Sequence, residues 1–239
     1  MFERAAGMFQ RVGDAANEAN ASYNQADLLN RQGRYAEAAA RLDRVLHVAR
    51  AVGDEELVGL VLREQGRALS RDGRPSGMDL LAAARAVFAD LGEPHEVTDT
   101  EIALAEAHLM AGRPGAALEA VASAVETAEA IGAVTLMPPA SRVSAAALVE
   151  LGELPAARRA LDDGLRLGSS PDLAHERGFL LVVAARAAEL AGSADAATLA
   201  AQARDALTSL GVVRAPLPWL TASDGPASDG PASEGPAHG

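Results

Sequence analysis

Lysine and cysteine are absent from this chain, and aromatic residues make up only 3% of it. Without cysteine the protein has no disulfide, no thiolate nucleophile and no cysteine-ligated zinc. The scarcity of aromatics disfavours a sheet, because strands are enriched in β-branched and aromatic residues. The hydrophobic share of 49% is instead mostly alanine, leucine and valine, which suits closely packed helices. We therefore expect an all-α protein.

Basic charge and long apolar runs are also scarce. The formal net charge of −12 argues against binding of nucleic acid by the chain itself and against binding to an anionic membrane. The longest apolar run, residues 179–185, is far shorter than the roughly 20 residues that span a bilayer. The first 14 residues carry charges where a signal peptide needs an apolar core. We predict a cytoplasmic protein that contacts neither nucleic acid nor membrane.

No catalytic or cofactor-binding motif is present in the sequence. The patterns of P-loops, dinucleotide-binding loops, zinc proteases and serine hydrolases are all missing. The five histidines show no metal-ligand spacing: His47, His95, His108, His175 and His238. We expect them at helix surfaces or caps, with His108 partly buried. We predict no catalytic residue, cofactor or metal, and the least favoured alternative is an enzyme acting on a small metabolite.

Glycines instead mark a regular internal repeat. They stand at Gly33, Gly73, Gly112, Gly152 and Gly192, spaced by 40, 39, 40 and 40 residues. A fixed period in this range is typical of a solenoid of helical hairpins. Proline follows several of these glycines, as expected for a turn and the first residue of the next helix. The predicted helix pairs are 15–32 and 35–52, 54–71 and 75–91, 94–111 and 115–131, 139–151 and 155–167, and 172–191 and 194–210.

The segments before and after this array have different sequence patterns. Residues 1–13 form an amphipathic pattern that we interpret as a half-repeat helix before the array at 14–213. Residues 214–220, with the only tryptophan, Trp219, are predicted to cap the last helix pair; a docking motif is the alternative. Residues 221–239 repeat ASDGP and lack large apolar side chains, so we predict a disordered tail.

Residues 20–49 resemble a tetratricopeptide repeat (TPR). The matching residues are Ala26, Gly33, Tyr35, Ala38 and Leu42, with equivalents in the third repeat at Ala105, Gly112, Ala117, Val121 and Ala124. The family's aromatic residue in the first helix is absent, and the period of 40 exceeds the usual length of about 34. The longer form resembles the C-terminal arrays of bacterial class III nucleotide cyclases and LuxR-type regulators. The resemblance implies a right-handed α-solenoid of about five hairpins whose first helices line a concave groove.

Arginines form a stripe on one of these first helices. Arg63, Arg67 and Arg71 drift by only about 80° around a helix, and apolar residues lie on the opposite side. We therefore place the stripe away from the core, facing the groove. Side chains of the neighbouring repeat would complete a candidate partner site: Tyr23, Asn24, Asp27, Asn30 and Arg31. Guanidinium groups there could hold carboxylates; the alternative is a solvated face paired with Glu55, Glu56 or Glu64.

Together these patterns predict a non-enzymatic scaffold of bacterial signalling that binds a protein or peptide through its concave face. The alternative is the C-terminal sensory or regulatory part of a larger adenylate or guanylate cyclase, or of a LuxR-type ATPase transcriptional regulator. Exposed terminal helices could also pair in a homodimer.

Overall fold

All regular structure in the described residues, 15–217, of the computed structural model is helical. The first helices of the five hairpins are α2 (Ala15–Arg31), α4 (Glu55–Arg71), α6 (Pro94–Met110), α8 (Met137–Glu150) and α10 (Ala174–Leu190). The second helices are α3 (Tyr35–Val52), α5 (Ser76–Leu91), α7 (Pro114–Ala130), α9 (Leu154–Leu167) and α11 (Ala196–Ser209). Short 3₁₀ turns, η1 (Val134–Leu136) and η2 (Pro171–Leu173), precede α8 and α10. The prediction of an all-α array of five hairpins is confirmed.

The helix limits follow from the glycine period. Each predicted limit lies within two residues of the observed one, the largest differences being at the starts of α8, α10 and α11. The five turn glycines have φ values between 63° and 80°, which is the left-handed region. Glycine therefore ends the first helix and lets the chain reverse at the same point in every repeat.

The first helices form an inner layer and the second helices an outer one. Each first helix packs on its hairpin partner and also on the first helix of the next repeat. Small residues make this close approach possible: Ala105 and Ala145 are fully buried, as their place at helix crossings predicts. The inner helices are consequently buried on more than one side. None of the helices in residues 15–217 is long and apolar enough to cross a bilayer.

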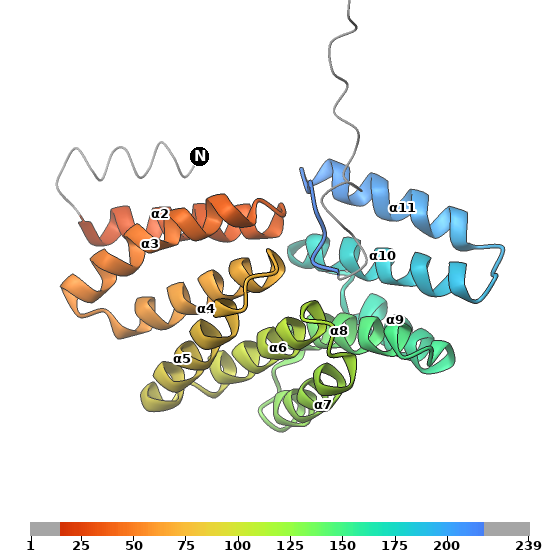
Figure 1. Cartoon of the computed structure of the whole chain (residues 1–239), viewed down its shortest axis with the longest axis horizontal. Helices are drawn as coiled ribbons and strands as arrows, with labels where there is room; N and C mark the ends of the chain where they lie inside the picture. Colours follow the sequence, from red (N-terminus) through yellow and green to blue (C-terminus); the bar gives the residue numbers. More distant parts are fainter. Residues whose placement is uncertain (1–14, 218–239) are drawn as a thin grey trace, which may run out of the picture.

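The hairpins follow one another around an arc, which brings the two ends of the array close together. Figure 1 shows α2 across a gap from α10 and α11, although the chain between them holds three further hairpins. The predicted half-repeat helix, Trp219 and the predicted disordered tail lie outside the described residues.

Residues 211–217, which we term the C-terminal clasp, bridge this gap. The Val213 N–H donates to the Gln32 carbonyl at 2.8 Å, and the Tyr35 hydroxyl donates to the Arg214 carbonyl at 3.2 Å. Burial raises the pKa of Tyr35 to about 12, so this hydroxyl keeps its proton. The other side of the clasp is apolar: Val212, Ala215 and Leu217 are buried within the core of the last hairpins. The clasp therefore joins the first hairpin to the last and turns the arc into a closed ring.

Candidate binding site

The arginine stripe of α4 lies in the interior of the array. Only 6% of Arg63 and 8% of Arg71 is exposed, so our prediction that the stripe points away from the buried interior is wrong for these two residues. The guanidinium carbon of Arg63 lies 5.3 Å from the centre of the Phe88 ring. The physical reason is the close packing of successive first helices, which covers the concave side of α4 with α6.

Carboxylates of α6 neutralise the buried arginines. Arg67 Nη2 lies 2.5 Å from Asp99 Oδ1, and Arg63 Nη1 lies 3.1 Å from Asp99 Oδ2. Arg63 also pairs with Glu96, and Arg67 Nη1 lies 3.0 Å from Glu64 Oε1 within α4. Of the acidic partners proposed from the sequence, Glu64 takes part. The main partners, in α6, were not foreseen.

The same pattern continues to the last hairpin. Arg71 Nη2 lies 2.8 Å from Glu106 Oε2, and Glu106 Oε1 lies 3.3 Å from Arg142 Nη1 in α8. Arg142 Nε then lies 2.5 Å from Glu176 Oε1 in α10. We refer to this set as the concave ion-pair chain: Arg63, Glu64, Arg67, Arg71, Glu96, Asp99, Glu106, Arg142 and Glu176. It links four successive first helices through charge-assisted hydrogen bonds.

Electrostatics keep these groups ionised despite their burial. Burial raises the pKa of Glu106, but Arg71 and Arg142 together outweigh it and lower that pKa to about 2. Burial likewise raises the pKa of Asp99, and Arg67 and Arg63 bring it below its ordinary value. The pKa of Arg142 is raised, because Glu176 and Glu106 outweigh the effect of burial. Each buried charge in this chain is thus stabilised by a neighbouring charge of opposite sign.

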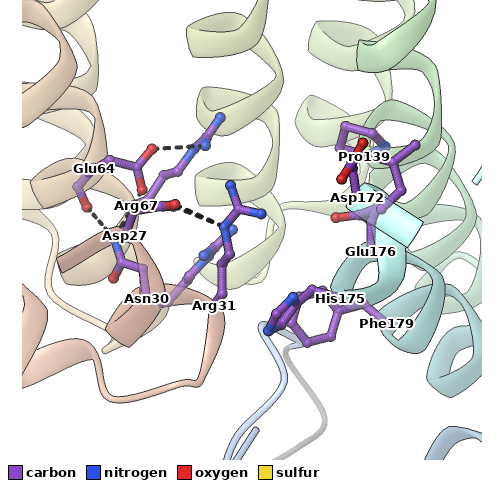
Figure 2. Close-up of a pocket in the computed structure, with 12 residues that line it drawn as sticks. Asp27, Asn30, Arg31, Glu64, Arg67, Pro139, Asp172, His175, Glu176 and Phe179 are labelled. Carbon is purple, nitrogen blue, oxygen red and sulfur yellow. Dashed lines mark hydrogen bonds and ion pairs between the residues drawn. The ribbon is translucent and has the colours of Figure 1, made fainter. Parts of the chain in front are cut away.

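A cavity of about 150 Å³ lies between the two ends of the array. One wall comes from α2 and α4: Asp27, Asn30, Arg31, Glu64, Arg67 and Arg71. The other comes from α8, η2 and α10: Pro139, Asp172, Leu173, His175, Glu176 and Phe179. Figure 2 shows the two groups of side chains facing each other across a gap, with Arg31 extending into it.

Several polar atoms of this cavity have no hydrogen-bond partner among the described residues. Asn30 donates from Nδ2 to the carbonyl and carboxylate oxygens of Glu64, at 2.8 and 3.1 Å, but its Oδ1 accepts no bond. Arg67 Nε and His175 Nε2 are also buried and unpartnered. Such groups destabilise a protein by about 1–3 kcal/mol each unless something satisfies them. Residues that line the cavity therefore carry buried polar atoms whose hydrogen bonds are not made.

The structure brings together most of the residues that the sequence placed in the groove. Asp27, Asn30, Arg31, Arg67 and Arg71 line the cavity. Of the remaining three, Tyr23 is half-buried against the core of the first two hairpins, Asn24 is exposed, and Arg63 is buried in its ion pairs.

Sequence reasoning missed the opposite wall, formed by Asp172, His175 and Glu176. His175, expected at a surface or cap, lies in the first turn of α10 and is half-buried. Its pKa is lowered first by burial and then by Arg31 across the gap. One signal was available: Glu106, Arg142 and Glu176 are spaced by 36 and 34 residues, so that residues of alternating charge fall on successive first helices.

Nothing in the described part of the chain groups three or more histidine or acidic side chains as a metal ion would require. Comparison of the chain with models of known protein families and with curated proteins gave no match. The TPR resemblance therefore rests on the matching residues and on the helical hairpins alone.

Proposed function

We propose that the chain is a non-enzymatic, TPR-like binding module of bacterial signalling that takes a protein or peptide partner on its concave face. The observation that supports this most is the continuous inner layer of five first helices, which carries charges of both signs. Solenoids use extended surfaces of this kind for recognition. The partner would be an extended segment with charged side chains.

The accessible charges, and not the buried arginines, are the proposed contacts. About half of the Arg31 side chain, 48%, is exposed, and Asp27 holds its Nε at 3.0 Å. Arg63 and Arg71 are already paired and covered, so they hold the first helices in place. Asn24 and Asp27 precede Arg31 by seven and four residues, and therefore share its helix face.

A random-peptide display selection on the full chain tests this proposal. An enriched peptide is then measured against Asn24→Arg, which places a long side chain on the exposed concave face of α2. The matched control is Ala40→Arg, which introduces the same side chain at an exposed position of α3. We expect Asn24→Arg to weaken binding about tenfold or more, equivalent to about 1.4 kcal/mol, and Ala40→Arg to leave it unchanged. Equal affinity in both variants, or no enriched peptide, would contradict the proposal.

A second candidate is a regulatory array within a longer cyclase or LuxR-type regulator. The observation that favours it is a groove of about 470 Å³ on the first hairpin, lined by Ala19, Val45 and Val48 among charged side chains. A preceding helical element could cover this groove. Blotting native cells with an antibody to the repeats tests it: a band well above 24.4 kDa supports a longer protein, and a band at that mass contradicts it.

A further inference from the structure

We propose that the cavity between the two ends of the array binds a small α-amino acid in its zwitterionic form. The carboxylate would face Arg31 and Arg67, and the ammonium would face Asp172 and Glu176. This goes beyond the partner proposed above, since it assigns a small-molecule ligand to the interior of the ring, in a cavity whose lining includes Asp27 and Arg31.

The size of the cavity limits the ligand class. A cavity of about 150 Å³ is the size that accommodates benzene, with about six non-hydrogen atoms. Glycine, alanine and serine are of this size. A nucleotide or a peptide of several residues is larger than this volume.

The charges that line the cavity favour a ligand that carries both signs. Three arginines, Arg31, Arg67 and Arg71, and four carboxylates, Asp27, Glu64, Asp172 and Glu176, line it. Four of these, Glu64, Arg67, Arg71 and Glu176, also take part in the concave ion-pair chain. A simple anion would meet these carboxylates as well as the arginines, and a simple cation would meet the arginines. A zwitterion can place each of its charges beside the opposite one.

The charges are also separated in space. Figure 2 shows Arg31 and Arg67 on one side of the gap and Asp172 and Glu176 on the other. The ion pair of Arg31 with Asp27 uses the Nε atom, and its terminal nitrogens extend into the gap. This arrangement presents donors to a carboxylate on one side and acceptors to an ammonium on the other.

Three residues that line the cavity also carry unpartnered buried atoms. Asn30 is 1% exposed, and its Oδ1 can only accept a hydrogen bond, whereas Arg67 Nε can only donate one. His175 Nε2 can do either, according to its tautomer. An α-amino acid both donates and accepts hydrogen bonds, so it matches the mixed hydrogen-bonding capacity of these residues.

Such a ligand would join the first and last hairpins. It would touch α2 and α4 on one side and η2 and α10 on the other, and these elements belong to opposite ends of the array. Ligand binding would consequently stabilise the closed ring, because a ligand stabilises the state to which it binds.

Isothermal titration calorimetry on the full chain tests the site. The probes are glycine, L-alanine and L-serine, compared with propionate and ethylamine, which carry one charge each. We expect at least one amino acid to bind, and propionate and ethylamine to bind at least tenfold more weakly. Arg31→Gln and Asp172→Asn should each weaken amino-acid binding tenfold or more. Both residues are exposed, so these variants are expected to fold.

The matched controls are Arg166→Gln and Asp163→Asn, which alter an exposed ion pair of the same residue types on α9. They should leave the affinity unchanged. Three results would overturn the proposal: no heat with any of the three amino acids up to millimolar concentrations, equal binding of propionate, or unchanged affinity in the Arg31 and Asp172 variants.

Discussion

The Glu106 carboxylate forms ion pairs with two buried arginines, Arg71 and Arg142. Burial alone would favour its neutral form, yet Arg71 and Arg142 lower its pKa to about 2, well below the value of about 4.3 in an unfolded chain. A pKa that is lower in the folded state stabilises the protein above the unfolded-state value, and this stabilisation is lost as the pH falls toward the folded-state value. Glu106 therefore makes the array acid-sensitive.

We predict that Glu106→Gln lowers the free energy of unfolding by about 3 kcal/mol at pH 7. The glutamine cannot ionise. The difference in the free energy of unfolding between wild type and variant should therefore shrink by about half or more at pH 3, where the ionised form of Glu106 stabilises the folded state less. Urea unfolding at the two pH values measures both differences. A difference that does not change with pH would show that the carboxylate charge is not what stabilises this position.

Gly33 shows how one residue permits the clasp. It has a φ of +80°, and a Cβ atom at this position would lie 2.2 Å from the Arg214 carbonyl oxygen. Gly73 has nearly the same backbone, with a φ of +77°, but no atom within 4 Å of the Cβ position. The two glycines therefore separate the effect of backbone strain from that of close approach.

We predict that Gly73→Ala costs about 1 kcal/mol of stability, from the left-handed backbone alone. Gly33→Ala should cost more and should release the clasp, because the new methyl group and the Arg214 backbone cannot occupy the same space. Trypsin cleavage after Arg214 reports the release. Equal cleavage rates in the two variants would contradict the role of Gly33.

At the scale of the helical hairpin, alanines at the crossings set the distance between helices. We predict that Ala105→Leu and Ala145→Leu each destabilise the protein by about 1–3 kcal/mol, since both positions are fully buried and cannot take a larger side chain without movement. Ala122→Leu, at an exposed position of α7, is the control. Thermal unfolding measures the effect, and wild-type melting in both buried variants would show that these crossings tolerate larger side chains.

The hairpins could be predicted from the sequence because each is a local feature. Glycine at a fixed interval, proline after it and small residues at crossings all act within one repeat. The cavity could not be predicted in the same way, because Arg31 and His175 are brought together by small rotations between repeats that accumulate along the array. The buried state of Arg63 and Arg71 was missed for a related reason: their partners, Asp99 and Glu106, belong to the next repeat.

At the scale of the whole molecule, the clasp holds the array as a ring. We predict that Val213→Pro opens it, because proline lacks the N–H that donates to the Gln32 carbonyl. Val213→Ala keeps this N–H and should not open the ring. The sequence has no cysteine, so a fluorescent donor and acceptor can be placed on Ala40→Cys in α3 and Ala201→Cys in α11. Energy transfer should fall only in the proline variant; an equal signal in both would count against the clasp.

Closure of the ring also has a consequence for synthesis of the chain. Tyr35 and its hydrogen-bond partner Arg214 are separated by 179 residues. At about 5–20 residues per second, the ribosome needs roughly 10–40 s to make the chain between them. During that time the first hairpin can fold on local contacts, but the binding partners of Gln32 and Tyr35 have not yet been made. The protein is therefore translated as an open array. The first hairpin can make its contacts with the clasp only after residues 211–217 have been synthesised.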